Sequence, residues 1–199
     1  MNYLGHFYLS GTNPDVIFGN FIGDVIKGSR WKAYPETIQK GILLHRFIDD
    51  FTDNHPDTKM AKDRIRIHFS ITSSIVVDMY FDHFLSLHWQ KYHHQSLLDF
   101  SHITFEKLKP FEKEMPSYTG ILYQKMRDEE WLLSYKSIKG VSFALSRMGK
   151  RVKFQNNWEK AEEVLKENYI LLEDDFHRFF PTLILQVSKR FGINFDETY

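Results

Sequence analysis

The chain has 199 residues, enough to bury a sizeable core within one domain. Its 26 Lys and Arg residues balance its 26 Asp and Glu residues, so the overall charge predicts neither nucleic acid nor a membrane surface as a partner. The absence of cysteine excludes disulfides and thiolate-bound metal.

The N-terminal stretch lacks both a basic segment and an uninterrupted apolar run, so no signal peptide is expected. No window approaches the ~20 apolar residues that a membrane-spanning helix needs. A content of 42% hydrophobic residues is typical of a folded, soluble protein, and we expect a cytoplasmic one.

Helical periodicity dominates the chain, beginning with an Asn13-Pro14 pair that is typical of a capped helix start. Strand signals are poor, and there is no repeat, low-complexity linker or domain boundary. The predicted helices cover 14–27, 35–53, 57–69, 73–94, 96–113, 118–134, 137–148, 153–179 and 181–191. The sequence therefore predicts an all-α, single-domain helical bundle over residues 1–199.

Two of these helices place polar side chains on faces that should be buried. In "GILLHRFIDDFTDNHPD", Ile38, Ile42, His45 and Asp49 share one helical stripe, and its lower half is an imidazole and a carboxylate. Unpaired burial of such groups is costly. They must therefore face a compensating partner.

The helix at 73–94 repeats this pattern. Ile75, Asp78, Asp82, Leu85 and Trp89 follow the rhythm of one face, so two carboxylates interrupt an apolar seam. His83 lies about 100° around the helix from Asp82, close enough for both to reach one point where a neighbouring helix approaches. Two further residues fit the set: Asp24 between Phe21 and Val25, and His6 after an apolar N-terminal stretch.

A divalent metal would supply the positive charge that these carboxylates need. Imidazole and carboxylate ligands suit manganese, iron or zinc, and some such sites admit magnesium. An open coordination position would lower the pKa of a bound water, which suits hydrolysis of phosphate esters. Structural roles remain an alternative, because Asp49 could pair with Arg46 and Asp53 could cap the turn at Asn54. The other histidines, His88 and His177 among them, show no comparable pairing.

Four blocks of the sequence, "MNYLGHFYLS", "FGNFIGDVIKG", "GILLHRFIDDFTDNHP" and "DMYFDHFLSLHW", resemble the bacterial acyl carrier protein phosphodiesterases. The resemblance spans most of the first ninety residues and is looser beyond them. It implies an all-α fold distantly related to the HD-type metal phosphohydrolases. It also implies divalent-metal-dependent hydrolysis that removes 4′-phosphopantetheine from holo-acyl carrier protein to give the apo carrier. Manganese is the first expectation for the metal, with magnesium, iron or zinc as alternatives.

The resemblance implies a set of site residues at the positions that the helical pattern also singles out. The contiguous His-Asp pair of ordinary HD enzymes is absent, which leaves open which residues bind metal directly and which orient the ligands. The expected metal ligands are Asp24, His45, Asp49, Asp82 and His83; His6 and Asp78 are the expected general acid or base; Asp53 also matches the family pattern. Arg46, next to His45, is a further catalytic candidate that could contact the phosphate or pair with Asp49 or Asp50.

An acidic carrier protein requires a local basic surface on this near-neutral chain. The best candidate is "SRMGKRVKF", and "KGSRWK" adds charge just after the Asp24 helix. The predicted substrate-binding residues are therefore Lys27, Arg30, Arg147, Lys150, Arg151 and Lys153. The alternative for each cluster is an ordinary solvent-exposed loop without a binding role.

Two alternative functions remain open from the sequence. One is an HD-like metal phosphohydrolase that acts on a nucleotide or another small phosphodiester. The other is a non-catalytic helical scaffold that binds an acidic partner.

Overall fold

The computed structural model describes residues 1–149 and 157–195. These residues form helices joined by short connections and contain no strand, which confirms the prediction of an all-α fold. The α-helices are α1 (Tyr3–Leu9), α2 (Pro14–Ile22), α3 (Glu36–Asn54), α4 (Pro56–Phe69), α5 (Ser73–Leu87), α6 (Leu97–Leu108), α7 (Ser117–Asp128), α8 (Trp131–Ser134), α9 (Ile138–Gly149), α10 (Ala161–Glu167) and α11 (Tyr169–Phe191). None of the described helices combines the length and hydrophobicity that a bilayer span requires.

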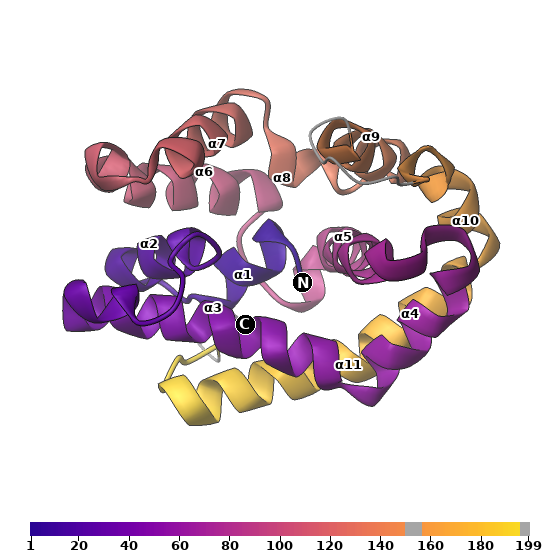
Figure 1. The fold of residues 1–199 in the computed structure, drawn as a ribbon, viewed down its shortest axis with the longest axis horizontal. Coiled ribbons are helices and arrows are strands. Elements are labelled where there is room, and N and C mark those ends of the chain that lie inside the picture. Colours follow the sequence, from indigo (N-terminus) through magenta and orange to yellow (C-terminus); the bar gives the residue numbers. More distant parts are fainter. Residues whose placement is uncertain (150–156, 196–199) are drawn as a thin grey trace.

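Helices α1 and α5 lie in the middle of the molecule, as Figure 1 shows. Helices α6 to α9 lie on one side of this pair, and α3, α4 and α11 lie on the other. Most apolar side chains of α5, including Val76, Tyr80 and Phe84, are completely buried, and only Leu87 at the end of the helix is exposed. A helix that is hydrophobic all round belongs in a core, and α5 is therefore the central element of this fold.

Several helices end earlier than their hydrophobic pattern predicts. Helix α2 stops at Ile22 with Gly23 as its C-cap, although the pattern continues to Lys27. The predicted helix at 73–94 ends at Leu87, and the one at 118–134 is interrupted at Glu130, which has a positive φ of 49°. Helix α1 was not predicted; its N-cap is Asn2, whose side chain accepts a hydrogen bond from the Tyr3 amide.

The predicted helix break at Pro181 is wrong, because α11 continues through this proline to Phe191. Phe176, Phe180, Leu183 and Val187 form one buried stripe across it, so burial favours a continuous helix. Pro181 itself is exposed, where water can bind the backbone carbonyl that the proline leaves without a partner. The break falls instead between α10 and α11, at Asn168.

Helices α2 and α3 cross with their backbones in contact, and glycines make this possible. A Cβ atom on Gly19 would lie 2.2 Å from the carbonyl oxygen of Ile38, and one on Gly41 would lie 2.3 Å from that of Val16. One turn along α2, a Cβ on Gly23 would lie 2.5 Å from the Cβ and Cγ of His45. The three glycines therefore bring the polar residues of α2 and α3 together.

Candidate metal centre

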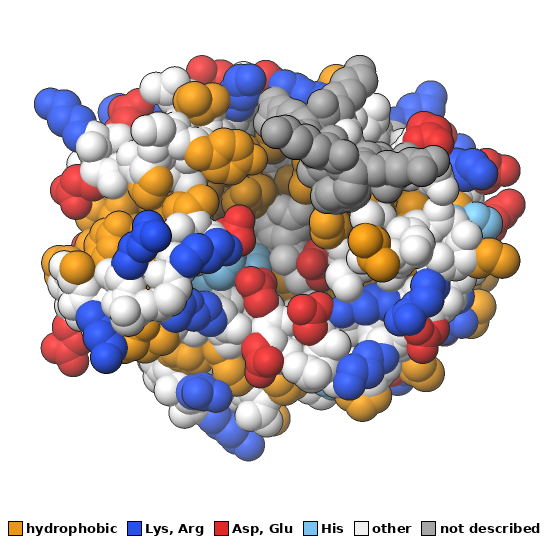
Figure 2. Space-filling model, viewed as in Figure 1, with side chains coloured by type: hydrophobic (Ala, Val, Ile, Leu, Met, Phe, Trp, Pro, Cys, Tyr) orange, Lys and Arg blue, Asp and Glu red, His pale blue; other side chains and the backbone are white. Residues whose placement is uncertain are grey.

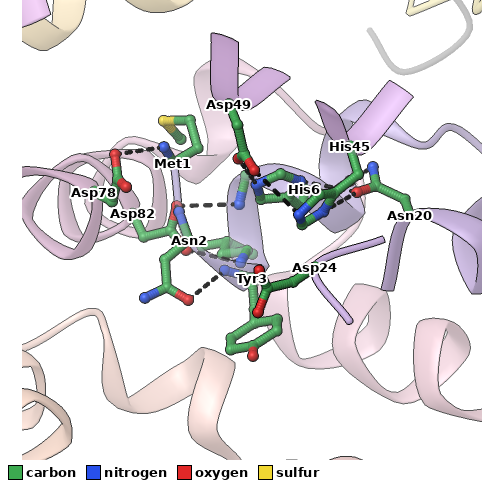
Figure 3. Close-up of polar contacts among 12 residues, drawn as sticks. Met1, Asn2, Tyr3, His6, Asn20, Asp24, His45, Asp49, Asp78 and Asp82 are labelled. Atoms are coloured by element: carbon green, nitrogen blue, oxygen red, sulfur yellow. Dashed lines mark hydrogen bonds and ion pairs between the residues drawn. The ribbon is translucent and has the colours of Figure 1, made fainter. Parts of the chain in front are cut away.

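The structure brings together two of the predicted ligands, His45 and Asp49, with His6 (Figure 3). His6 comes from α1, and the other two lie one turn apart on α3. Asp49 Oδ1 is 3.2 Å from His6 Nε2, and Asp49 Oδ2 is 3.1 Å from His45 Nε2. The two imidazole rings are stacked with their centroids 4.4 Å apart. One ligand atom from each residue lies within 4.8 Å of the other two, which is close enough for all three to bind one ion.

This cluster lines a pocket of about 200 Å³ that opens to the surface. Figure 2 shows the hollow at the centre of one face, with histidine and carboxylate surface along its edge. Apolar side chains, including Tyr3, Phe21, Ile75 and Met148, form much of the remaining wall. The Asp49 side chain is 48% exposed, whereas that of His6 is only 7% exposed, so the carboxylate faces the opening and the imidazole lies behind it.

Asn20, from α2, contacts the Nδ1 atoms of both imidazole rings. Its Oδ1 atom is 2.8 Å from His6 Nδ1 and 3.2 Å from His45 Nδ1. Its Nδ2 group donates to the His6 backbone carbonyl, which can only accept, and also to Ser10 Oγ. The amide orientation is thereby fixed, with Oδ1 as the acceptor for both histidines. Both imidazoles are thus held as the tautomer protonated at Nδ1.

This tautomer leaves the Nε2 lone pair of each neutral imidazole directed at the Asp49 carboxylate. A lone pair facing an anion is unfavourable unless a proton or a metal ion lies between them. Two adjacent imidazolium ions would repel each other in this partly buried position. A divalent cation held by the two Nε2 atoms and Asp49 would satisfy every group at once, so the residues fit a metal ion.

The electrostatics of the cluster favour a neutral His6 beside an ionised carboxylate. Burial lowers the pKa of His6, and His45 lowers it further, against the opposing effect of Asp49. Burial raises the pKa of Asp49, but the close approach of the His45 and His6 imidazoles outweighs that effect and places the pKa well below the usual range. These are the protonation states that metal ligands need.

Asp24 and Asp78 line the same pocket without joining the three-residue cluster. The Asp24 side chain is exposed at the rim, and Lys27 Nζ lies 3.4 Å from its Oδ1 atom. Asp78 accepts a hydrogen bond of 2.7 Å from the ammonium group of Met1. Burial raises the pKa of Asp78 despite this ammonium group.

The structure does not bring Asp82 and His83 to this cluster. The Asp82 carboxylate is fully buried and accepts hydrogen bonds from the backbone amides of Asn2, Leu4 and Gly5 at 2.8 to 3.2 Å. Asp82 thus binds the otherwise unpaired amides at the start of α1. Burial raises the pKa of Asp82 to about 7, against the Met1 ammonium group and these amides.

His83 points toward a different part of the molecule. Its Nδ1 atom donates to the Tyr135 carbonyl at 2.7 Å, and its Nε2 atom is 3.1 Å from the Tyr169 hydroxyl. The expectation that Asp82 and His83 reach one point therefore differs from the structure. Their 100° separation directs Asp82 to α1 and His83 to α11, because different helices pack on the two faces of α5.

The alternative pairings considered for α3 are also resolved. Arg46 donates hydrogen bonds to the backbone carbonyls of Ile26 and Gly28, at 2.7 and 3.0 Å. It therefore stabilises the segment after α2 and does not pair with Asp49. Asp53 forms an ion pair of 2.6 Å with Lys62 of α4. Both side chains therefore have structural partners outside the cluster.

The predicted basic residues divide into three groups. Lys27 and Arg30 are exposed after α2. Arg147 pairs with Glu129 and lies over the rings of Trp131 and Phe143, so its charge is compensated. Lys150, Arg151 and Lys153 lie outside the described residues.

Asn20 is the residue of this centre that the sequence patterns left unnoticed. It is completely buried and lies in the otherwise apolar run "FGNFI". A polar side chain within an apolar helix is the same signal that identified His45 and Asp49. Applied to α2, it would have identified Asn20 as well.

Replacing Asn20 with alanine is expected to lower metal affinity by about 10- to 100-fold, because the two imidazoles lose the acceptor that fixes their tautomer. Metal titration of the purified variant would measure this change. Asn13→Ala provides a comparison, because Asn13 caps the same helix through the amides of Asp15 and Val16 but does not contact the cluster. Equal metal affinity for both variants would contradict the positioning role of Asn20.

The fold and this centre define an all-α protein with two imidazoles and one carboxylate at an open pocket, a set typical of metal-dependent hydrolases. The family model described as acyl carrier protein phosphodiesterase matches residues 1–183. The chain therefore belongs to the acyl carrier protein phosphodiesterase family.

Relatives named acyl carrier protein phosphodiesterase match almost the full chain. One from Enterobacter sp. (strain 638) is 29% identical over 191 residues, which cover 96% of this chain and 99% of the relative. Others from Salmonella agona (strain SL483) and Escherichia coli O157:H7 are each 27% identical with the same coverage. No solved structure matches the chain significantly.

Proposed function

We propose that this protein is a divalent-metal-dependent phosphodiesterase that removes 4′-phosphopantetheine from holo-acyl carrier protein. The observation that supports it is the cluster of His6, His45 and Asp49 with both Nε2 lone pairs directed at one carboxylate, at an open pocket of a chain in this family. The reaction adds water across the phosphodiester bond. The bond between phosphorus and the serine oxygen breaks, the serine oxygen takes a proton, and the products are the apo carrier and free 4′-phosphopantetheine.

His6 Nε2, His45 Nε2 and the Asp49 carboxylate would hold the metal. Bound there with open positions, the ion would lower the pKa of a water and offset charge on the phosphate. Two nitrogen ligands and one carboxylate favour manganese, iron or zinc over magnesium, and manganese remains our first proposal.

The pocket geometry also suggests how the chain's own residues handle protons. Both nitrogens of His6 are used, one by Asn20 and one toward Asp49, so we assign His6 to metal binding rather than to acid–base catalysis. Asp78 is held by the Met1 ammonium group. Asp24 is the exposed carboxylate at the rim, and we propose that it orients the attacking water and accepts its proton, or adds a further metal ligand.

The surroundings of the pocket suit the two parts of the proposed substrate. Apolar walls from Tyr3, Phe21, Ile75 and Met148 could contact the pantetheine arm. Lys27 and Arg30, exposed after α2, would meet the acidic carrier protein. Arg147 would contribute little unless it leaves Glu129, and Lys150, Arg151 and Lys153 remain proposals from the sequence.

The test is incubation of the metal-loaded protein with a holo-acyl carrier protein, followed by mass spectrometry of the carrier. The proposed reaction predicts a loss of roughly 340 Da, the mass of the phosphopantetheine group, and this loss should stop when a chelator removes the metal. Parallel incubations with nucleotides test the small-phosphodiester alternative. A metal-loaded protein that leaves the carrier intact would refute the proposal, and a metal-free protein that binds the carrier unchanged would support the scaffold.

A further inference from the structure

A second group of metal-binding side chains lies where the end of α5 meets α11. It consists of His88, Glu173 and His177, which share no residue with the pocket described above. His88 follows the last residue of α5, and Glu173 and His177 lie four residues apart on α11. Residues at this spacing share one helix face, and this face is turned toward His88.

The three side chains converge closely. His88 Nε2 is 2.5 Å from Glu173 Oε1, and the rings of His88 and His177 have centroids 4.6 Å apart with an angle of 55° between their planes. One ligand atom from each residue lies within 4.8 Å of the other two. Small inward movements of these side chains would place all three around a single ion.

The negative charge of this group comes from Glu173 itself. Around His177, the negative Asp174 is balanced by the positive Lys91. The side chains of His88 and Glu173 are 20% and 25% exposed, so solvent or another ligand can reach a fourth coordination position.

We propose that His88, Glu173 and His177 form a second metal site, which binds zinc and joins the end of α5 to α11. Two imidazoles and one carboxylate with an open fourth position are a common zinc ligand set. Among the divalent ions usually available, zinc is bound more tightly by nitrogen-rich sites than manganese or iron. The site is independent of the proposed hydrolysis, because none of its ligands lines the pocket.

The site can be tested in the full-length Asp49→Asn variant, in which the first cluster is weakened. After removal of metal with a chelator, titration with zinc should show about one tight equivalent per chain, and cobalt should give the visible absorption of a four-coordinate ion. Zinc binding should also raise the melting temperature. Adding Glu173→Gln, which keeps the side-chain shape, or His177→Ala should lower zinc affinity by about 100-fold or more.

His102→Ala is the matched control, since His102 and Glu130 form an exposed pair 3.9 Å apart, and no third ligand joins them among the described residues. This control should leave zinc affinity unchanged. If Asp49→Asn binds no zinc, or if Glu173→Gln and His177→Ala bind it as tightly as their parent, the second site does not exist. If Asp49→Asn still fills the first cluster, the titration shows two equivalents, and the same substitutions should then remove one of them.

Discussion

Replacing Asp49 with asparagine is expected to remove the metal from the pocket and to lower phosphodiesterase activity by about 1,000-fold. The carboxylate contacts both histidines, and its loss leaves two imidazoles and an amide, a weaker ligand set for a divalent ion. Metal catalysis of this kind contributes several kcal/mol, and about 4 kcal/mol corresponds to a factor of about 1,000 in rate. Metal content and turnover of holo-acyl carrier protein would measure the two effects.

Asp50→Asn is the matched control for this prediction. Asp50 is the next residue of α3, is exposed, and accepts a hydrogen bond from Asn54 rather than from the cluster. This variant should keep both metal and activity. If Asp49→Asn retained wild-type metal content and turnover, the proposed centre would be wrong.

Replacing Gly41 with alanine is expected to destabilise the protein by about 3 kcal/mol and to weaken metal binding as well. The new Cβ would lie 2.3 Å from the Val16 carbonyl oxygen, a backbone atom that cannot move aside without shifting α2. The gain of about 1 kcal/mol in helix propensity cannot offset this clash. His45 lies one turn further along α3 and contacts Asn20 of α2, so separating the helices disturbs the ligands.

Denaturant unfolding and metal titration of Gly41→Ala would measure these two losses. Gly120→Ala is the control, because a Cβ on this glycine of α7 would meet its nearest atom, Met115 Cβ, at an ordinary 3.8 Å. That variant should be unchanged or slightly stabilised. Equal stability of the two variants would show that the α2–α3 crossing tolerates separation.

The helical class and much of the site follow from local patterns. His45 and Asp49 share one face because they lie four residues apart, and any helix over 36–53 must place them together. The same pattern applied to Asp78 and Asp82 predicts a shared face, but their partners differ. Asp78 lines the pocket with the Met1 ammonium group beside it, whereas Asp82 binds the amides at the start of α1. The spacing of two residues determines whether they share a helix face, but it does not determine which other helix packs against that face.

The C-terminal region shows the same limit for helix boundaries. Proline usually ends a helix, and this local rule fails at Pro181 because a buried apolar stripe continues on both sides of it. His88 and His177 have no pairing signal in the sequence, since 89 positions separate them and they meet only where α5 packs on α11.

The sequence by itself determined the all-α class, the polar stripes on α3 and α5, and the family resemblance, because helical periodicity and short motifs are local properties of the chain. Only the tertiary structure decided which polar residues meet. The glycine crossing of α2 and α3 brings Asn20 to His45, and α1 adds His6 to the same point. The physical reason is that ligand geometry depends on how helices from distant parts of the sequence pack, and packing is fixed by contacts that no single segment contains.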